Sequence, residues 1–371
     1  MSGATPTTGT CRACFSVEKK YKERSGDPNF FLLHAERDVI TAPKSDKEKK
    51  KRKKLLQDQL EKRVAALRNT VGGVVIVHLH GQASTDRYLE YFDEFIGNPF
   101  SELLEDGRLF VETYVRHWLS TLPGFEDFYD FVHINVCKTA GVATVDFCTK
   151  TCNDFEKKNP SVLNILSILS RTFYTKVHQP QIRGIPLPAE VDSLHENRAI
   201  ELKTFMNPEA EKDVVQFVDH VWFDLKLREN LTSLTKVEHG GSFYVGITEE
   251  KNKDTTYKTK TPKILGFHVS FPHENITEHI QQKIAEHVTV LQLNGLFEDA
   301  PSDLINIAFH EVRDSHPRKF VLEIAVRHFD GIVFYDKEGP RTYLIDHGNI
   351  VRMTRMEWLH RVRCRLPPWI I

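Results

Sequence analysis

A glycine turn leads directly into a strand in the stretch Glu238-His239-Gly240-Gly241-Ser242-Phe243-Tyr244-Val245-Gly246-Ile247. Two adjacent glycines permit a tight turn, and the aromatic and β-branched residues after them favour a strand. Upstream, an apolar stripe recurs at helical spacing through Val214, Val218, Trp222 and Leu225. The local unit is therefore a helix, a glycine turn and a strand.

The same unit occurs earlier in the chain. Its predicted helix carries the apolar stripe Leu56, Leu60, Val64 and Leu67. The turn follows at residues 69–73, which include Gly72 and Gly73, and a β-branched strand is predicted at 74–79. Two occurrences of one local plan suggest a duplicated fold.

Further elements complete an α+β pattern. Helices are predicted at 161–173 and along an apolar face formed by Ile276, Ile280, Ile284, Val288 and Leu291. Strands are predicted at 131–136, 264–269, 321–326, 331–335 and 341–345, the last three at hairpin spacing. The fold class we expect is α+β, with mixed sheets and packed helices.

Changes in composition predict the domain boundaries. Residues 1–44 begin with Ser, Thr, Gly and Pro and are expected to form a disordered tail. Within the tail, Phe30-Phe31-Leu32-Leu33 is either an edge strand of this chain or a peptide that docks on a partner. A first half is expected at 45–178, a proline-rich connection at 179–190 and a second half at 191–371.

A basic block at residues 44–54 precedes the first helical stripe. Such a block can contact RNA phosphates or act as a localisation signal, but it can also be a solvated helix end. The sequence leaves these alternatives open.

Composition places the chain among globular proteins. Of its 371 residues, 40% are hydrophobic and 10% aromatic, enough for one large or two ordinary domains. The net charge is −1, so any contact with nucleic acid must come from charges clustered on one surface. No stretch approaches the ~20 apolar residues that cross a bilayer, so we expect no membrane segment.

The cysteines are scattered through a sequence without a signal-peptide pattern: Cys11, Cys14, Cys137, Cys148, Cys152 and Cys364. This usage indicates reduced thiols in a cytoplasmic or nuclear protein, and we expect the cytoplasm. The pair Cys11-x-x-Cys14 has no second pair nearby, so a zinc site there would need ligands from elsewhere. The phosphate loop, the dinucleotide fingerprint, the nucleophile elbow and the His-Glu-x-x-His helix are absent from the sequence.

Three carboxylates are the strongest candidates for chemistry. Apolar and charged residues alternate in 200–203, so Glu201 and Lys203 share one face of a predicted strand. Glu196 is five residues before Glu201, an odd spacing that requires a turn or bulge if the two are to meet. Glu249 stands just beyond the second predicted glycine-turn strand and meets Glu201 if the two strands pair.

Three converging carboxylates repel one another unless protons or a divalent cation neutralise them. Mg²⁺ or Mn²⁺ held by such oxygens can activate water for phosphodiester cleavage, and Lys203 can hold the phosphate. Solvated strand-edge glutamates are the plain alternative. Four lysines are the candidates for RNA binding, and a solvated lysine-rich loop is the alternative for most of them: Lys203, Lys236, Lys251 and Lys253.

These motifs resemble the core domain of the Schlafen family. The resemblance is carried by Glu196-x4-Glu201-Leu202-Lys203 and by the stretch 238–249, which ends in Glu249. It extends to the glycine turn at 67–75 and to a closing segment at 349–358, and it covers roughly residues 45–365. It implies a horseshoe of two related AlbA-type lobes, the second of which, 191–371, carries the acidic site.

The resemblance also implies a function. Schlafen cores grip transfer RNA and other structured RNA, and several cut it with three acidic residues and Mn²⁺ or Mg²⁺. By position, Glu196, Glu201 and Glu249 take these roles, with Glu249 in place of the usual aspartate. The family's zinc ligands have no match in 306–310 or 327–331, so zinc is not expected. The segment between Glu201 and Glu249 is longer than usual.

A single core without a following helicase-like domain resembles the nematode Schlafen-like subunits that assemble into the endonuclease trimming piRNA precursors. This implies RNA and sister Schlafen-like subunits as partners, which would bring the chain to perinuclear granules or an organelle surface. Three functions remain open: an endoribonuclease subunit, a catalytically silent RNA-binding scaffold, and a DNA-binding or regulatory module.

Overall fold

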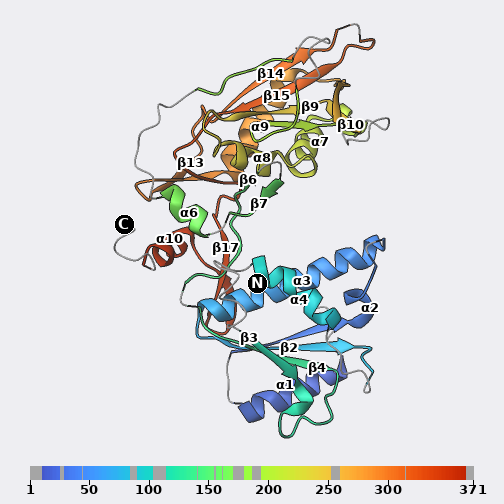
Figure 1. Cartoon of the computed structure of the whole chain (residues 1–371), viewed down its shortest axis with the longest axis vertical. Coiled ribbons are helices and arrows are strands. Elements are labelled where there is room, and N and C mark those ends of the chain that lie inside the picture. The colour runs from blue at the N-terminus through green and yellow to red at the C-terminus, as the bar shows by residue number, and fades with distance from the viewer. Residues whose placement is uncertain are drawn as a thin grey trace. The chain divides into compact units, whose positions relative to one another are not determined.

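A computed structural model of the chain (Figure 1) shows two compact units, unit 1 at Met1–Asp146 and Pro340–Ile371 and unit 2 at Phe147–Gly339. The residues it describes are 11–25, 29–43, 45–83, 90–102, 114–139, 141–153, 156–160, 162–169, 179–185, 194–251, 260–313 and 315–364. The fold is α+β, as predicted. The division falls at Phe147, whereas the sequence placed it at 179–190. The described part of that stretch, 179–185, belongs to unit 2 and forms neither helix nor strand.

Unit 1 is built on one four-stranded sheet in the order β1-β2-β4-β3, in which β1 and β2 are parallel and the other pairs antiparallel. Its helices are α1 (Arg12–Ser25), α2 (Arg37–Ile40), α3 (Lys47–Asn69), α4 (Glu90–Glu102), the 3₁₀ helix η1 (Leu119–Thr121) and α10 (Arg355–Cys364). Its strands are β1 (Phe30–Glu36), β2 (Gly73–His80), β3 (Tyr114–Trp118), β4 (Phe131–Val136), β5 (Thr144–Asp146), β17 (Arg341–Asp346) and β18 (Asn349–Arg352). Strand β17 pairs with β5 and β18, which returns the C-terminal segment to this unit.

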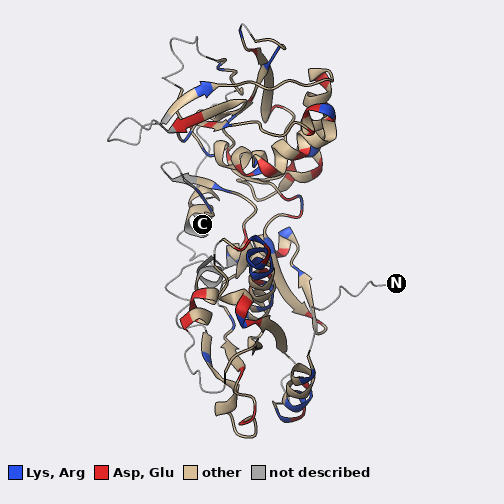
Figure 2. Ribbon diagram, turned by 90° about the vertical axis from the view of Figure 1, so that its right-hand side faces the viewer, with Lys and Arg blue, Asp and Glu red and all other residues tan. Residues whose placement is uncertain are grey.

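Helix α3 follows from local signals that the sequence displays. Asp46 caps its first turn by accepting a hydrogen bond from the Lys49 amide at 3.0 Å. The predicted apolar stripe packs on the sheet, with Leu60 and Val64 fully buried. The basic block lies on the first turns of this helix, where Lys49 forms a surface ion pair with Asp38. In Figure 2, blue Lys and Arg residues and red Asp and Glu residues are interspersed along the described helices.

The prediction of a disordered tail at 1–44 was wrong for the part of it that the structure describes. Helix α1 covers the face of the sheet opposite α3 and buries Cys14, Val17 and Tyr21. Only three buried positions in a highly charged helix make a weak periodic signal, which explains why sequence reasoning missed the helix. The 30–33 segment forms β1 at the sheet edge, which confirms the edge-strand interpretation.

Unit 2 is built on a second four-stranded sheet, in the order β14-β15-β9-β8. Its helices are α6 (Val162–Leu169), the 3₁₀ helix η3 (Ala210–Lys212), α7 (Val214–Asp219), the π-helix η4 (His220–Asp224), α8 (Leu227–Leu234) and α9 (His273–His287). Its strands are β6 (Thr151–Asn153), β7 (Glu156–Lys158), β8 (Ile200–Lys203), β9 (Gly241–Val245), β10 (Ile247–Lys251), β11 (Lys260–Ile264), β12 (Thr289–Gln292), β13 (Phe297–Asp299), β14 (Ile305–Glu311), β15 (Phe320–Val326) and β16 (Gly331–Phe334). Helices α7, α8 and α9 share a core with one face of the sheet.

Two predictions about the second half need correction. Val288 and Leu291 were assigned to the helix that carries Ile276, but α9 ends at His287 and Leu291 lies in β12. The strands predicted at hairpin spacing do not pair with one another, because β15, β16 and β17 belong to three different sheets. Spacing along the chain cannot distinguish a hairpin from strands that pair with distant partners.

The two sheets share one topology. In unit 1, β1 is parallel to β2, and β4 and then β3 follow outward; in unit 2, β8 is parallel to β9, and β15 and then β14 follow. The glycine turns occupy equivalent places. A Cβ at Gly73 would lie 2.1 Å from the Asn29 carbonyl oxygen, and one at Gly241 would lie 2.4 Å from that of Ala199. Both units thus repeat one local plan.

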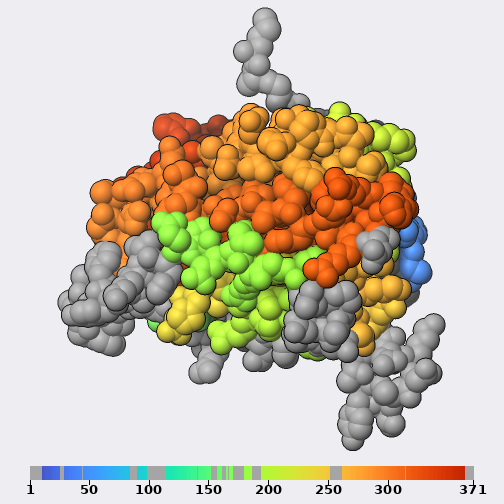
Figure 3. Space-filling view, turned by 90° about the horizontal axis from the view of Figure 1, so that it is seen from above, coloured from blue at the N-terminus to red at the C-terminus, as the bar shows by residue number. Residues whose placement is uncertain are grey.

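The segment 179–185 lies along the four-stranded sheet of unit 2. Glu323, which is fully buried, accepts hydrogen bonds from the backbone amides of Arg183 and Gly184, both at 2.9 Å. Its carboxylate also accepts one from Ser242 Oγ at 2.8 Å and contacts His310 Nε2 at 2.8 Å. In Figure 3, atoms drawn in green lie against atoms drawn in orange. The buried Glu323 carboxylate therefore holds the segment 179–185 against the sheet.

Among the helices that the structure describes, none combines the length and apolar character needed to cross a membrane.

Candidate functional site

The candidate site lies in unit 2 at the edge strand β8. Asn197 and Ile200 form an antiparallel bridge, in which the Asn197 amide donates to the Ile200 carbonyl at 3.0 Å. The Asn197 side chain closes the turn by accepting from the Ala199 amide at 2.8 Å. This tight turn brings Glu196 back beside β8, where its carboxylate accepts a hydrogen bond from the Leu202 amide at 3.3 Å.

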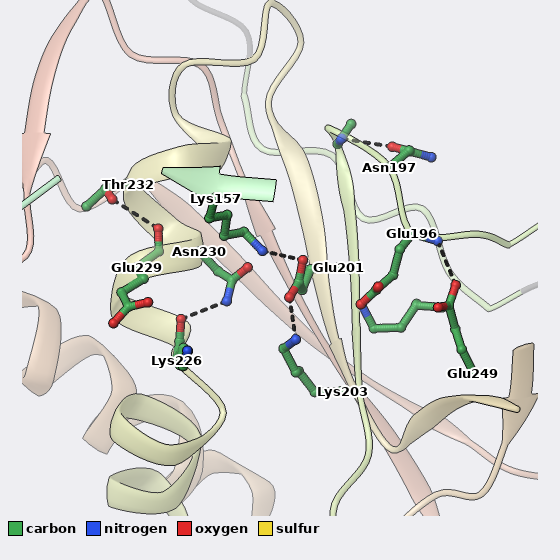
Figure 4. A network of polar contacts seen from close by, with 12 residues as sticks. Lys157, Glu196, Asn197, Glu201, Lys203, Lys226, Glu229, Asn230, Thr232 and Glu249 are labelled. Atoms are coloured by element: carbon green, nitrogen blue, oxygen red, sulfur yellow. Dashed lines mark hydrogen bonds and ion pairs between the residues drawn. The ribbon is translucent and has the colours of Figure 1, made fainter. Parts of the chain in front are cut away.

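Glu249 reaches the same place from a different element. Strand β9 ends at Val245, and the Gly246 amide donates to the Lys203 carbonyl at 2.8 Å. Strand β10 then leaves the sheet, and the Glu249 carboxylate accepts a hydrogen bond from the Glu196 amide at 3.3 Å. Figure 4 shows Glu196 and Glu249 drawn together beside β8.

Glu201 is held by two ammonium groups. Its two carboxylate oxygens form ion pairs with Lys157 and Lys203, and its side chain is only 15% exposed. In Figure 4 both lysines point toward Glu201, and Glu196 and Glu249 lie on the other side of the ribbon. Lys157 comes from β7, and sequence reasoning missed it because nothing in its polar surroundings indicates contact with a residue 44 positions away.

Electrostatics distinguish the carboxylates. Burial and then the negative charge of Glu201 raise the pKa of Glu196 above its usual value, while Lys203 opposes the rise. Burial also acts to raise the pKa of Glu201, but Lys157 and Lys203 outweigh it and lower this pKa. Glu249 raises the pKa of Glu196 further, so Glu196 interacts with both of the other carboxylates.

The donor set suits a hard cation in its chemistry, since Mg²⁺ and Mn²⁺ prefer carboxylate oxygens. The mutual repulsion that raises the pKa of Glu196 is what a divalent cation would offset. Within the described ranges, however, the three carboxylates are not a group whose oxygens all lie within 4.8 Å of one another. Binding one cation with all three would require Glu201 to exchange a lysine for the ion and the carboxylates on the two sides of β8 to move closer together.

The lysines predicted to bind RNA have different positions. Lys203 lies at the site. The Lys236 ammonium is enclosed, donating to Thr149 Oγ1 at 2.6 Å and to the Thr232 carbonyl at 2.7 Å, and burial lowers the pKa of Lys236 to about 7. It lines a polar cavity of about 180 Å³ instead of an outer groove. Lys251 has its backbone in β10, and Lys253 lies outside the described residues.

Comparison with known proteins gives no family. No family model matches the chain, and no curated protein matches it. Among solved structures, the N-terminal domain of a putative ATP-dependent DNA helicase RecG-related protein from Nitrosomonas europaea is similar over 38% of this chain and 69% of that chain. The sequence identity is 13% and the TM-score 0.24, and a likeness at that level supports no inference about this chain.

Proposed function

We propose that this chain is a metal-dependent RNA endonuclease, or a subunit of a multi-subunit Schlafen-like endonuclease, that acts on tRNA-like RNA or small-RNA precursors. The observation that carries the proposal is the gathering of three carboxylates and two lysines around β8. Phosphodiester cleavage needs both kinds of group, oxygens to hold a cation and ammonium groups to hold the phosphate.

Each residue has a role in this proposal. Glu196, Glu201 and Glu249 would hold Mg²⁺ or Mn²⁺, which supplies charge for the transition state and an activated water when bound. Lys157 and Lys203, now paired with Glu201, would turn toward an incoming phosphate. Burial and the neighbouring Glu201 raise the pKa of Glu196, and a bound cation would offset that repulsion.

A catalytically silent RNA-binding scaffold is the second candidate. It is favoured by one specific observation, the engagement of both Glu201 oxygens by Lys157 and Lys203. If those ion pairs persist when RNA binds, the carboxylate serves to position two lysines and holds no cation. Both functions involve RNA, and they differ in whether the chain contributes to cleavage.

Cleavage of labelled structured RNA and of short capped RNA in Mn²⁺ separates the two functions. We compare the wild type with Glu201→Gln, each alone and with sister Schlafen-like subunits. A catalytic site predicts at least a ~100-fold loss of cleavage in Glu201→Gln, since a metal ligand is removed while the side chain keeps its shape.

The matched control is Glu250→Gln, because Glu250 neighbours Glu249 but its side chain is 60% exposed and pairs with Lys263 at the surface. This variant should cleave as the wild type does. Equal cleavage by the wild type and Glu201→Gln in the reconstituted complex would reject the catalytic role and leave the scaffold.

A further inference from the structure

Four potential metal ligands converge in unit 1, far along the chain from the carboxylates of unit 2. They form the Cys/His cluster, which consists of Cys11, Cys14, His34 and His78. Their sulfur and nitrogen ligand atoms all lie within 4.8 Å of one another. Cys14 is fully buried and His78 is 2% exposed, whereas Cys11 and His34 are partly buried, so the cluster reaches from the interior of the unit toward its surface.

The fold itself brings these residues together. The parallel register of β1 and β2 sets His34 directly beside His78, and residues paired in this way point to the same face of a sheet. Helix α1 packs on that face and begins at Arg12, so the Cys-x-x-Cys spacing places Cys11 and Cys14 on the first turn, next to the histidines. The start of α1 and the strands β1 and β2 therefore bring their cysteine and histidine side chains to one place.

The distances agree with tetrahedral coordination of a single ion. With zinc–sulfur bonds of about 2.3 Å and zinc–nitrogen bonds of about 2.0–2.1 Å, a tetrahedral site has ligands about 3.8 Å apart for two sulfurs, about 3.5 Å for sulfur and nitrogen, and about 3.3 Å for two nitrogens. The two sulfurs are 3.6 Å apart and the two histidine Nδ1 atoms 3.1 Å apart. The sulfur-to-nitrogen distances from Cys14 are 3.3 Å to His78 and 3.6 Å to His34.

A carboxylate supports the most buried histidine. His78 turns Nδ1 toward the sulfurs, and its other nitrogen, Nε2, lies 3.0 Å from Asp130 Oδ2. Histidine ligands of zinc usually donate their second N–H to such a carboxylate, which fixes the ring and its tautomer. The His78 ring is also stacked on Phe131, with centroids 4.2 Å apart. Its orientation toward the cluster is thus fixed from two sides.

We propose that the Cys/His cluster binds one structural zinc ion that fastens α1 to the sheet of unit 1. Two thiolates and two imidazoles are a donor set typical of zinc, and four protein ligands leave no open position for catalysis. The expectation that zinc is absent rested on the missing ligands in unit 2 and on the lone Cys11-x-x-Cys14 pair. The histidines that complete the set lie 20 and 64 positions beyond Cys14, where sequence spacing gives no signal.

A redox-active cysteine pair is the competing explanation. A disulfide between Cys11 and Cys14 would use the same spacing. It would leave unexplained why both histidines direct Nδ1 to the sulfurs and why Asp130 supports one of them. The convergence of four ligands favours zinc.

Metal analysis of the purified full-length chain tests the proposal. After extensive dialysis, we expect about one equivalent of zinc per chain, and Co²⁺ exchanged into the protein should give the visible absorption of tetrahedral cobalt bound to thiolate. Cys11→Ser and His34→Ala should each lose the zinc. Both residues are only partly buried, so these variants are expected to fold. A strong chelator should lower the melting temperature of the wild type and not that of the variants.

The chain offers matched controls. Cys137 is an exposed free cysteine, and His80 is an exposed histidine whose ring centroid lies 5.4 Å from that of His34. Cys137→Ser and His80→Ala should keep the full zinc content. A wild type that contains no zinc and binds no Co²⁺, a Cys11–Cys14 disulfide found in the native chain by mass spectrometry, or undiminished zinc in both ligand variants would each overturn the proposal. These readouts do not depend on RNA cleavage, so failure here leaves the proposed function of unit 2 untouched.

Discussion

A single buried histidine makes the stability of unit 1 sensitive to acid. His133 lies on the face of the sheet that α1 covers, is 4% exposed and contacts the Tyr21 hydroxyl through Nε2 at 3.2 Å. In the part of the chain that the structure describes, its Nδ1 has no hydrogen-bond partner. Burial, and then the neighbouring His117, lower the pKa of His133 to about 4. The folded protein therefore keeps this ring neutral.

The unfolded chain binds a proton at His133 near pH 6.5, whereas the folded chain binds it only near pH 4. His133 should therefore leave the free energy of unfolding unaffected above pH 6.5 and lower it as the pH drops from 6.5 to 4, contributing a loss of about 2 kcal/mol between pH 7 and pH 5. Urea unfolding at these two pH values measures this loss. His133→Gln should lose roughly 2 kcal/mol less than the wild type over this range.

His347→Gln is the control for this measurement, because the His347 side chain is 92% exposed in the same unit. Its pH dependence should match that of the wild type. Identical pH dependence in His133→Gln and the wild type would show that His133 is not kept neutral by the fold.

Residue-scale features were the hardest to predict from the sequence. The resemblance identified Glu196, Glu201 and Glu249, and the structure brings Glu196 and Glu249 into contact. It could not identify Lys157, because an ion pair between separate elements leaves no trace in spacing. The same reason hid the histidine ligands of the Cys/His cluster.

At the scale of elements, each unit has a turn in which one glycine cannot be replaced by a larger residue without a clash. At Gly73 a Cβ would also lie 2.7 Å from Leu67 Cδ2, and at Gly241 it would lie 2.5 Å from Leu234 Cδ2, each leucine being on the helix before the turn. The backbone at Gly73 has φ +145°, which L side chains rarely adopt. The helix, the turn and the edge strand thus meet at a point without room for a side chain.

We predict that Gly73→Ala and Gly241→Ala each lower the free energy of unfolding by more than ~2 kcal/mol, because the clashing atom is a backbone oxygen that cannot move alone. Gly97→Ala in α4 is the matched control, since a Cβ there meets nothing within 4 Å. It should raise the free energy of unfolding by up to ~1 kcal/mol, through helix propensity. Urea unfolding of the three variants checks this, and a Gly73→Ala variant as stable as the wild type would contradict it.

Elements with strong local signals were predicted, and their pairing was not. Helix α3 was found from its stripe, and β4 was found at its observed bounds. The pairing of β16 with β12 and of β17 with β5 depends on contacts between distant segments, so the hairpin expectation failed. Helix α1 was missed because its few apolar residues are separated by charged ones.

At the scale of the whole molecule, one sheet topology carries two different clusters of polar residues. Unit 2 carries carboxylates and lysines around β8, the edge strand of its parallel pair. Unit 1 has Phe31 at the register position that Glu201 occupies in unit 2, and its polar cluster of cysteines and histidines lies on the face covered by α1. The duplication suggested by the sequence is thus visible in the topology, and the two copies differ in the residues placed on it.

Binding of Mn²⁺ to the full-length chain tests the central claim most directly, because it requires neither the natural RNA nor a partner subunit. Electron paramagnetic resonance would follow free Mn²⁺ during titration of the wild type, Glu201→Gln and Glu250→Gln, all first loaded with zinc so that the Cys/His cluster is occupied. A cation site formed by Glu196, Glu201 and Glu249 predicts a bound Mn²⁺ that is weakened at least ~10-fold in Glu201→Gln and unchanged in Glu250→Gln. Equal Mn²⁺ binding by the wild type and Glu201→Gln would contradict the account and leave these carboxylates as partners of Lys157 and Lys203.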